Sequence, residues 1–123
     1  MGLAGRVIFT GYVADDDLPL WYSAAELLVF PSVYEGFGLP VVEAMACGTP
    51  VIASNSSSIP EAVGDAGLLF APDDVAALVN QMTAVLTNSS LRATLRQQGL
   101  VHAQTFSWER AGRETAAVYH RAL

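Results

Sequence analysis

Two glutamates bracket a glycine-containing loop that has the composition of a phosphate-binding turn. The nine residues from Glu35 to Glu43 read Glu-Gly-Phe-Gly-Leu-Pro-Val-Val-Glu. Glycine permits main-chain conformations that other residues resist, and it lets a ligand approach the backbone closely. Pro40 suits the first turn of a helix, where its missing N–H would be unpaired in any case. The amides around Phe37, Gly38 and Leu39 are therefore expected to point at an anion from a helix N-terminus, without a lysine.

The two carboxylates suggest what is attached to that anion. Glu35 lies in the loop and Glu43 about one turn into the expected helix. A carboxylate accepts hydrogen bonds from hydroxyl groups, so a sugar or a ribose diol is a natural partner. Spacing and glycines alone favour this interpretation no more than a pair of surface glutamates beside a turn.

The charged residues exclude several other kinds of chemistry. The chain has 123 residues, a net charge of −6, six arginines and no lysine. Without lysine there is no P-loop lysine for a nucleotide and no Schiff base. A negative chain lacks the basic surface that binds nucleic acid or an anionic membrane by charge. Neither class of partner is expected.

The single cysteine and the short apolar runs suggest where the protein works. With only Cys47 there is no internal disulfide and no cysteine cluster for zinc, so we expect no metal and a cytoplasmic location. Residues 1–13 hold no apolar stretch of signal-peptide length. No apolar run is long enough to form a transmembrane segment.

Short apolar runs alternate with helical patterns along the chain, which predicts an α/β fold with a parallel sheet. The loop that begins at Glu35 then follows a strand, where open parallel sheets bind ligands. The four expected strands are Val7–Thr10, Leu27–Phe30, Val51–Ala53 and Leu68–Phe70. The expected helices follow Asp17, run from Pro40 to Cys47 and from Ile59 to Val63, and fill the chain after Asp73.

Three ordered stretches resemble glycosyltransferase family 4, whose members are retaining enzymes with the GT-B fold. They read FPSVYEGFGLPVVEAMACGTPVIAS, IPEAVGDAGLLFAPDD and FSWERAGRETAAVY. Glu35 and Glu43, with seven residues between them, resemble the E-x7-E motif of these enzymes. The resemblance runs from about Val7 to Tyr119 and implies a Rossmann-like sheet with helices on both faces.

The resemblance also implies a role for each site residue. Glu35 corresponds to the glutamate that contacts the transferred sugar near its reacting carbon, and Glu43 to the one that holds the ribose hydroxyls. Gly36, Phe37, Gly38 and Leu39 match the amides that face the sugar and diphosphate. Gly11, Tyr12 and Val13 resemble the loop beside the base. The implied reaction transfers a hexose from a nucleoside diphosphate sugar with retention, and no cofactor is expected beyond that donor substrate.

The chain departs from the family in extent. It resembles the later part of the second GT-B domain, so residues 1–123 form a partial nucleotide-sugar-binding domain. The first two strands of that domain and the acceptor-binding domain are expected to be missing. The arginine and lysine that contact the donor phosphates are missing with them. The isolated chain is therefore expected to be inactive. Two alternatives remain open: a stand-alone module that binds nucleotide-sugars or nucleoside diphosphates without catalysis, and an assembly subunit that joins a partner through exposed sheet edges.

The expected loss of two strands leaves the strand at Leu27–Phe30 with an open edge. Open edges recruit other strands. Either the strand at Val7–Thr10 moves inward to pair with it, or two chains pair or exchange that strand about a two-fold axis. The homodimer is favoured, with residues 11–17 as the hinge.

Four other residues are expected to be structural or superficial rather than catalytic. Cys47 lies where the family packs a small residue between helix and sheet. His102 and His120 are expected on helix surfaces with no second ligand near them. Trp108 is expected to anchor the last helix by packing.

Overall fold

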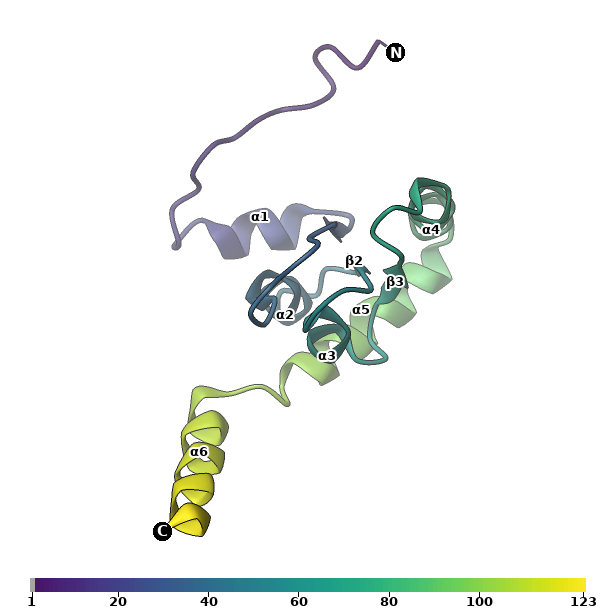
Figure 1. Ribbon diagram of the computed structural model, residues 1–123. Helices are drawn as coiled ribbons and strands as arrows, with labels where there is room; N and C mark the ends of the chain where they lie inside the picture. Colours follow the sequence, from purple (N-terminus) through teal and green to yellow (C-terminus); the bar gives the residue numbers. More distant parts are fainter. Residues whose placement is uncertain (1) are drawn as a thin grey trace.

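Residues 2–123 form a three-stranded parallel sheet and six helices in the computed structural model (Figure 1). The strand order is β1-β2-β3, with Val29 opposite Ile52 and Ala53 opposite Leu69. The predicted α/β class and parallel sheet are thus confirmed. The elements are α1 (Leu18–Ala24), β1 (Leu28–Phe30), α2 (Leu39–Ala46), β2 (Val51–Ser54), α3 (Ile59–Val63), β3 (Leu68–Phe70), α4 (Val75–Thr87), α5 (Ser89–Ala103) and α6 (Trp108–Ala122).

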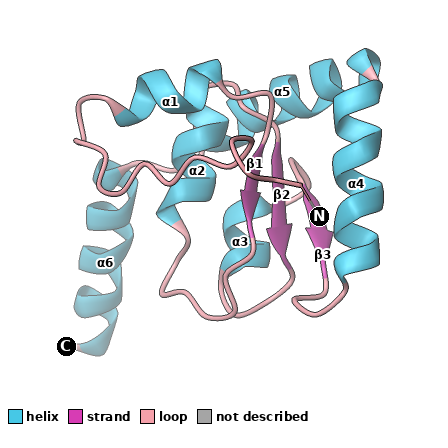
Figure 2. Ribbon diagram, turned by 90° about the horizontal axis from the view of Figure 1, so that it is seen from above, coloured by secondary structure: helices cyan, strands magenta, loops and turns pink. Residues whose placement is uncertain are grey.

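Helices cover both faces of the sheet, because successive side chains of a strand point to opposite sides. Val51 and Ala53 of the central strand pack with α2 and α3 in one core cluster. Ile52, between them, packs on the other side with Val85 of α4 and Leu95 of α5. Figure 2 shows α5 lying across the end at which the strands begin. The predicted two-sided arrangement is therefore confirmed.

Local sequence signals set the ends of several helices. Gly48, with φ 77°, follows α2 in the left-handed conformation that helix C-termini favour in glycine. Asp74 accepts a hydrogen bond from the Ala77 amide at the start of α4. Asn88 ends α4 and caps α5 by accepting from the Leu91 amide. Ser107 caps α6 as predicted. These side-chain oxygens pair amides that a helix start leaves without partners.

The predicted strand at Val7–Thr10 is wrong, and the alternative in which this segment moves inward to pair with β1 is wrong as well. Residues 7–10 belong to no strand, and Ile8 and Phe9 are 82% and 94% exposed. Figure 1 shows the N-terminal segment running as an extended trace away from the sheet. An apolar run becomes a strand only when a neighbour pairs with its amides and carbonyls. Among residues 2–123, no segment pairs with this one.

The last helix forms as predicted, but it does not pack. No residue of α6 is buried, and Trp108 is 83% exposed, so the expectation that Trp108 anchors this helix is wrong. Val118 and Tyr119 are exposed on the same helix. Figure 1 shows α6 projecting from the body of the chain. Within residues 2–123, no helix is long and apolar enough to cross a membrane.

Candidate functional site

The loop between β1 and α2 is held in place by serines from the loop that follows β2. The Glu35 amide donates to Ser57 Oγ at 2.9 Å, and the Glu35 carbonyl accepts from Ser57 Oγ at 2.8 Å and Ser58 Oγ at 3.0 Å. Both loops leave the carboxyl ends of neighbouring parallel strands, which is where such sheets bind ligands. The main chain is thus pinned at the residue that begins the glycine-containing turn.

The Glu35 side chain is also oriented by a serine. Ser32 Oγ donates to Glu35 Oε1 at 2.8 Å, and the Ser32 carbonyl in turn accepts from the hydroxyl of Ser54, which is fully buried. Glu35 is half-buried. The hydrogen bond occupies one carboxylate oxygen and leaves Oε2 without a partner among residues 2–123. The motif from Glu35 to Glu43 does not point to these serines, although the density of hydroxyls from Ser54 to Ser58, directly after a strand, was a usable signal.

The two glycines of the turn have different structural requirements. Gly38 has φ 93°, which L-residues with a side chain rarely adopt, and it stands directly before α2. Gly36 has no left-handed φ, and a Cβ there would meet nothing within 4 Å. The fold therefore explains the glycine at position 38 and does not explain the one at position 36.

Four consecutive amides, three in the turn before α2 and one at its first residue, have no acceptor. Among residues 2–123, the N–H groups of Gly36, Phe37, Gly38 and Leu39 donate to no backbone or side-chain oxygen. The first amides of a helix lack intrahelical partners and favour a negative charge. This arrangement is chemically able to bind an anion through the main chain alone.

An aromatic contact with the chain after α5 supports the same turn. The ring of Phe37 meets Phe106 edge-on, with centroids 5.5 Å apart, and Phe106 meets His102 in the same manner at 5.1 Å. His102 Nε2 lies 3.0 Å from the Ala62 carbonyl. His102 is half-buried, so the prediction that it lies on the helix surface is wrong. The chain after α5 thereby supports the turn.

Glu43 lies on the second turn of α2 and contacts α1. The Tyr22 hydroxyl donates to Glu43 Oε2 at 3.0 Å. Burial, together with this hydrogen bond to the carboxylate, raises the pKa of Tyr22 to about 12. An open cavity of about 520 Å³ lies beside the pair, lined by Leu18 of α1, by Cys47 and by Asp15. Its volume is in the range of small-molecule sites.

The structure does not bring Gly11, Tyr12 and Val13 onto this site. They lie in the extended N-terminal segment, Tyr12 is 87% exposed, and no hydrogen bond joins them to residues 35–43. Their expected place depended on a strand at Val7–Thr10, which does not form. Asp15, two residues later, is the part of this segment that reaches the cavity.

The family follows from comparison with known proteins. Residues 1–88 match the family model described as Glycosyl transferases group 1. The chain belongs to this family. It is 48% identical, over 94% of its length, to the O-antigen chain mannosyltransferase B of Escherichia coli. It is 39% identical over its full length to a D-inositol 3-phosphate glycosyltransferase of Salinispora arenicola.

Solved structures of other proteins share the fold of this glycosyltransferase chain. Sucrose-phosphate synthase from Thermosynechococcus elongatus superposes over 98% of the chain with a TM-score of 0.84 and 39% identity. Anabaena HepE in complex with UDP-glucose superposes with a TM-score of 0.85 and 29% identity, again over 98% of the chain. The chain spans about 30% of the length of the mannosyltransferase and 31% and 34% of these two structures. The predicted family is therefore confirmed.

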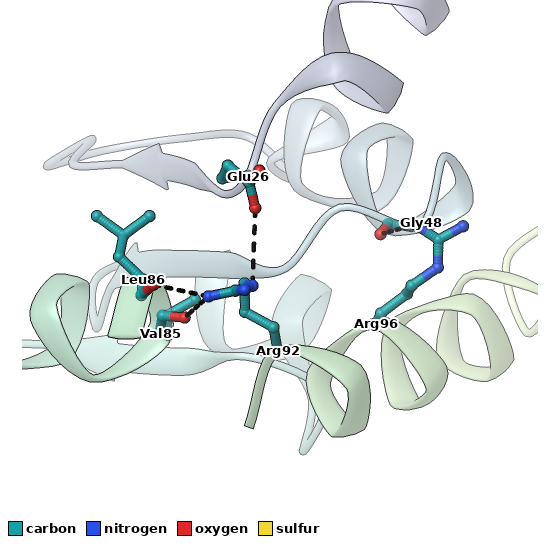
Figure 3. Close-up of polar contacts among 6 residues, drawn as sticks. All are labelled: Glu26, Gly48, Val85, Leu86, Arg92 and Arg96. Atoms are coloured by element: carbon teal, nitrogen blue, oxygen red, sulfur yellow. Dashed lines mark hydrogen bonds and ion pairs between the residues drawn. The ribbon is translucent and has the colours of Figure 1, made fainter. Parts of the chain in front are cut away.

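A second cavity in this glycosyltransferase chain, of about 240 Å³, is lined by two arginines (Figure 3). Arg92 Nη1 donates to the carbonyls of Val85 and Leu86 at the end of α4, and Arg92 Nε lies 3.6 Å from Glu26 Oε2. Arg96 Nη1 donates to the Gly48 carbonyl, just beyond α2. Arg92 therefore stabilises the C-terminus of α4, whose carbonyls carry partial negative charge, and Arg96 holds the backbone just after α2.

The position of these arginines separates them from the Glu35 loop. Glu26 and Gly48 precede β1 and β2, so the second cavity lies at the amino ends of the strands, whereas Glu35 lies beyond their carboxyl ends. The two arginines are not placed to neutralise an anion bound at the α2 N-terminus.

Proposed function

We propose that this glycosyltransferase chain binds the nucleotide part of a sugar donor at the start of α2. The observation that carries the proposal is the run of four unpaired amides from Gly36 to Leu39, next to a Glu35 that serines hold on both sides. Such amides bind a diphosphate without lysine. The open space around Gly36 gives further support, because a side chain there would occupy the position of a bound ligand.

The remaining assignments follow from this placement of the diphosphate. In the proposal, Glu35 contacts the sugar near its reacting carbon and Glu43 accepts hydrogen bonds from the ribose hydroxyls. The base lies beside Gly11, Tyr12 and Val13, which requires the N-terminal segment to move toward the turn from Glu35 to Glu43. The similarity to HepE, solved with UDP-glucose, and to a mannosyltransferase supports a nucleoside diphosphate hexose as donor.

The proposed reaction is hexosyl transfer with retention. The sugar acquires oxocarbenium character as the diphosphate departs. Amides at the α2 N-terminus, aimed at the departing diphosphate, would stabilise that charge. We expect residues 1–123 by themselves to bind the donor without transferring the sugar, because they span about 30% of the length of the relatives. A cytoplasmic location belongs to the same proposal, since the single cysteine is unpaired.

A titration of the chain with UDP and with GDP, followed by NMR, tests the proposal. Glu43→Ala is expected to weaken binding of the bound nucleotide by about 1–3 kcal/mol, the cost of a lost hydrogen bond to a charged group. Glu61→Ala is the matched control, because Glu61 is also an exposed helical glutamate but lies on α3. An unchanged affinity in Glu43→Ala would exclude the ribose role. Turnover of a nucleotide-sugar by residues 1–123 would contradict the expected lack of transfer.

A role in assembly is the second candidate, and the exposed N-terminal segment favours it. Val7, Ile8 and Phe9 are apolar and exposed, and β1 pairs with β2 on one side only among residues 2–123. Two chains that exchange this segment would cover both features. Light scattering is expected to show a dimer, and a monomer at every concentration would rule this assembly out.

A further inference from the structure

Tyr22 is held in a fixed position between α1 and α2. Its ring packs against the core cluster formed by α2, β2 and α3. Its backbone carbonyl accepts a hydrogen bond from the hydroxyl of Thr49, which is 2% exposed. The phenol oxygen is thereby placed by contacts to buried parts of the fold, at the wall of the cavity between α1 and α2.

Glu43, in contrast, has one restraint on its carboxylate. Its side chain is exposed, and a free glutamate side chain samples many rotamers, whose loss on ordering costs free energy. The Tyr22 hydroxyl donates to Oε2 at 3.0 Å, and no other group among residues 2–123 bonds to this carboxylate. Oε1 therefore stays available to a ligand while Tyr22 restricts the rotamer.

The phenol acts in this contact as a donor. Burial and the adjacent carboxylate keep the hydroxyl protonated, with its pKa raised to about 12. A hydrogen bond between a hydroxyl and an ionised carboxylate is stronger than one between neutral groups. Tyr22 therefore holds Glu43 Oε2 as a hydrogen-bond donor.

We propose that Tyr22 is a positioning residue for the nucleotide: it fixes Glu43 Oε2 so that Oε1 faces the ribose hydroxyls. This inference rests on the proposed function and assigns a residue that the E-x7-E motif does not contain. Tyr22 acts through Glu43 and need not touch the ligand. Preorganisation of this kind raises affinity because the rotamer is already restricted before binding.

The experiment compares Tyr22→Phe with Tyr119→Phe, which removes a hydroxyl from an exposed tyrosine on α6. Both variants and the unmodified chain are titrated with UDP, with GDP, with their 2′,3′-dideoxy counterparts and with pyrophosphate. Tyr22→Phe is expected to lower affinity for the ribonucleotide about three- to tenfold, the effect of one hydrogen bond. Affinity for the dideoxy compounds and for pyrophosphate is expected to stay the same, and Tyr119→Phe to change nothing.

A second measurement separates positioning from a general structural effect. In a Glu43→Ala background, Tyr22→Phe is expected to have no further effect on ribonucleotide affinity, because a double-mutant cycle isolates the coupling. Equal losses for ribonucleotide, dideoxynucleotide and pyrophosphate would overturn the positioning role, as would additive losses in the cycle. If the unmodified chain binds a nucleotide and Tyr22→Phe binds it equally well, only the role of Tyr22 fails. If the unmodified chain binds neither nucleotide, the proposed function fails with it.

Discussion

The region around β2 and the two ends of the chain have similar apolar patterns, but their apolar side chains differ in burial. Val51, Ile52 and Ala53 are fully buried between helices on both sides of the sheet. Val7, Ile8 and Phe9 form an equally apolar run and are exposed. On the helices, Val85 of α4 is buried and Val118 of α6 is 52% exposed. An apolar run therefore gives a strand or helix an apolar face. Whether that face is buried depends on whether other elements of the fold pack against it.

The largest difference in the free energy of unfolding is expected between two valine-to-alanine substitutions, one in the buried core and one on the exposed last helix. Val85→Ala removes two methyl groups from a closed core and is expected to lower the free energy of unfolding by about 2 kcal/mol. Val118→Ala is expected to be neutral or slightly stabilising, because alanine has the higher helix propensity. Urea denaturation at a concentration where the chain is monomeric measures both. Equal destabilisation by Val118→Ala would show that α6 packs as α4 does.

A smaller loss of stability is expected within the turn before α2, where Gly36 and Gly38 differ in role. Gly38→Ala is expected to destabilise the chain by about 1–2 kcal/mol because of its left-handed φ, since the added Cβ would meet only ordinary contacts. Gly36→Ala is expected to leave thermal stability unchanged while weakening nucleotide binding. Melting curves and titrations on both variants test this separation. If Gly36→Ala binds as well as the unmodified chain, the ligand does not approach the backbone there.

The smallest loss of stability is expected for a substitution at the amino ends of the strands. Arg92→Ala removes the cation that bonds the last carbonyls of α4 and is expected to cost about 1 kcal/mol. Arg113→Ala is the control, because its ion pair with Glu109 is exposed on α6 and is worth about 0.5 kcal/mol or less. Nucleotide affinity is expected to be unchanged in both. A loss of affinity in Arg92→Ala would place a ligand at this edge after all.

Local features of the chain were predictable because they depend on neighbouring residues. The strands at Leu28–Phe30, Val51–Ser54 and Leu68–Phe70, the glycine after α2 and the Ser107 cap all agree with the predictions within a residue or two. The turn from Glu35 to Glu43 was predictable as well, because glycine and Pro40 restrict the backbone there. Three consecutive motifs also sufficed to indicate the glycosyltransferase family.

The partners of these residues were not predictable from their neighbours. Nothing near Glu35 in the sequence shows that Ser57 and Ser58, more than twenty positions later, pin its backbone. Nothing near Tyr22 in the sequence shows that its hydroxyl donates to Glu43, 21 positions later. His102 and Phe106 support Phe37 from the far end of α5.

The sequence by itself determined the family, the type and order of most elements, and the residues that begin and end them. It determined these because helix caps, left-handed glycines and apolar periodicity act over a few residues. The tertiary structure alone decided that Val7–Thr10 remains unpaired, that Trp108 is exposed, that Arg92 and Arg96 bond backbone carbonyls of other segments, and that Tyr22 and the serines orient the two glutamates. Strand pairing, burial and side-chain hydrogen bonds each need a second surface, and that surface comes from distant parts of the chain.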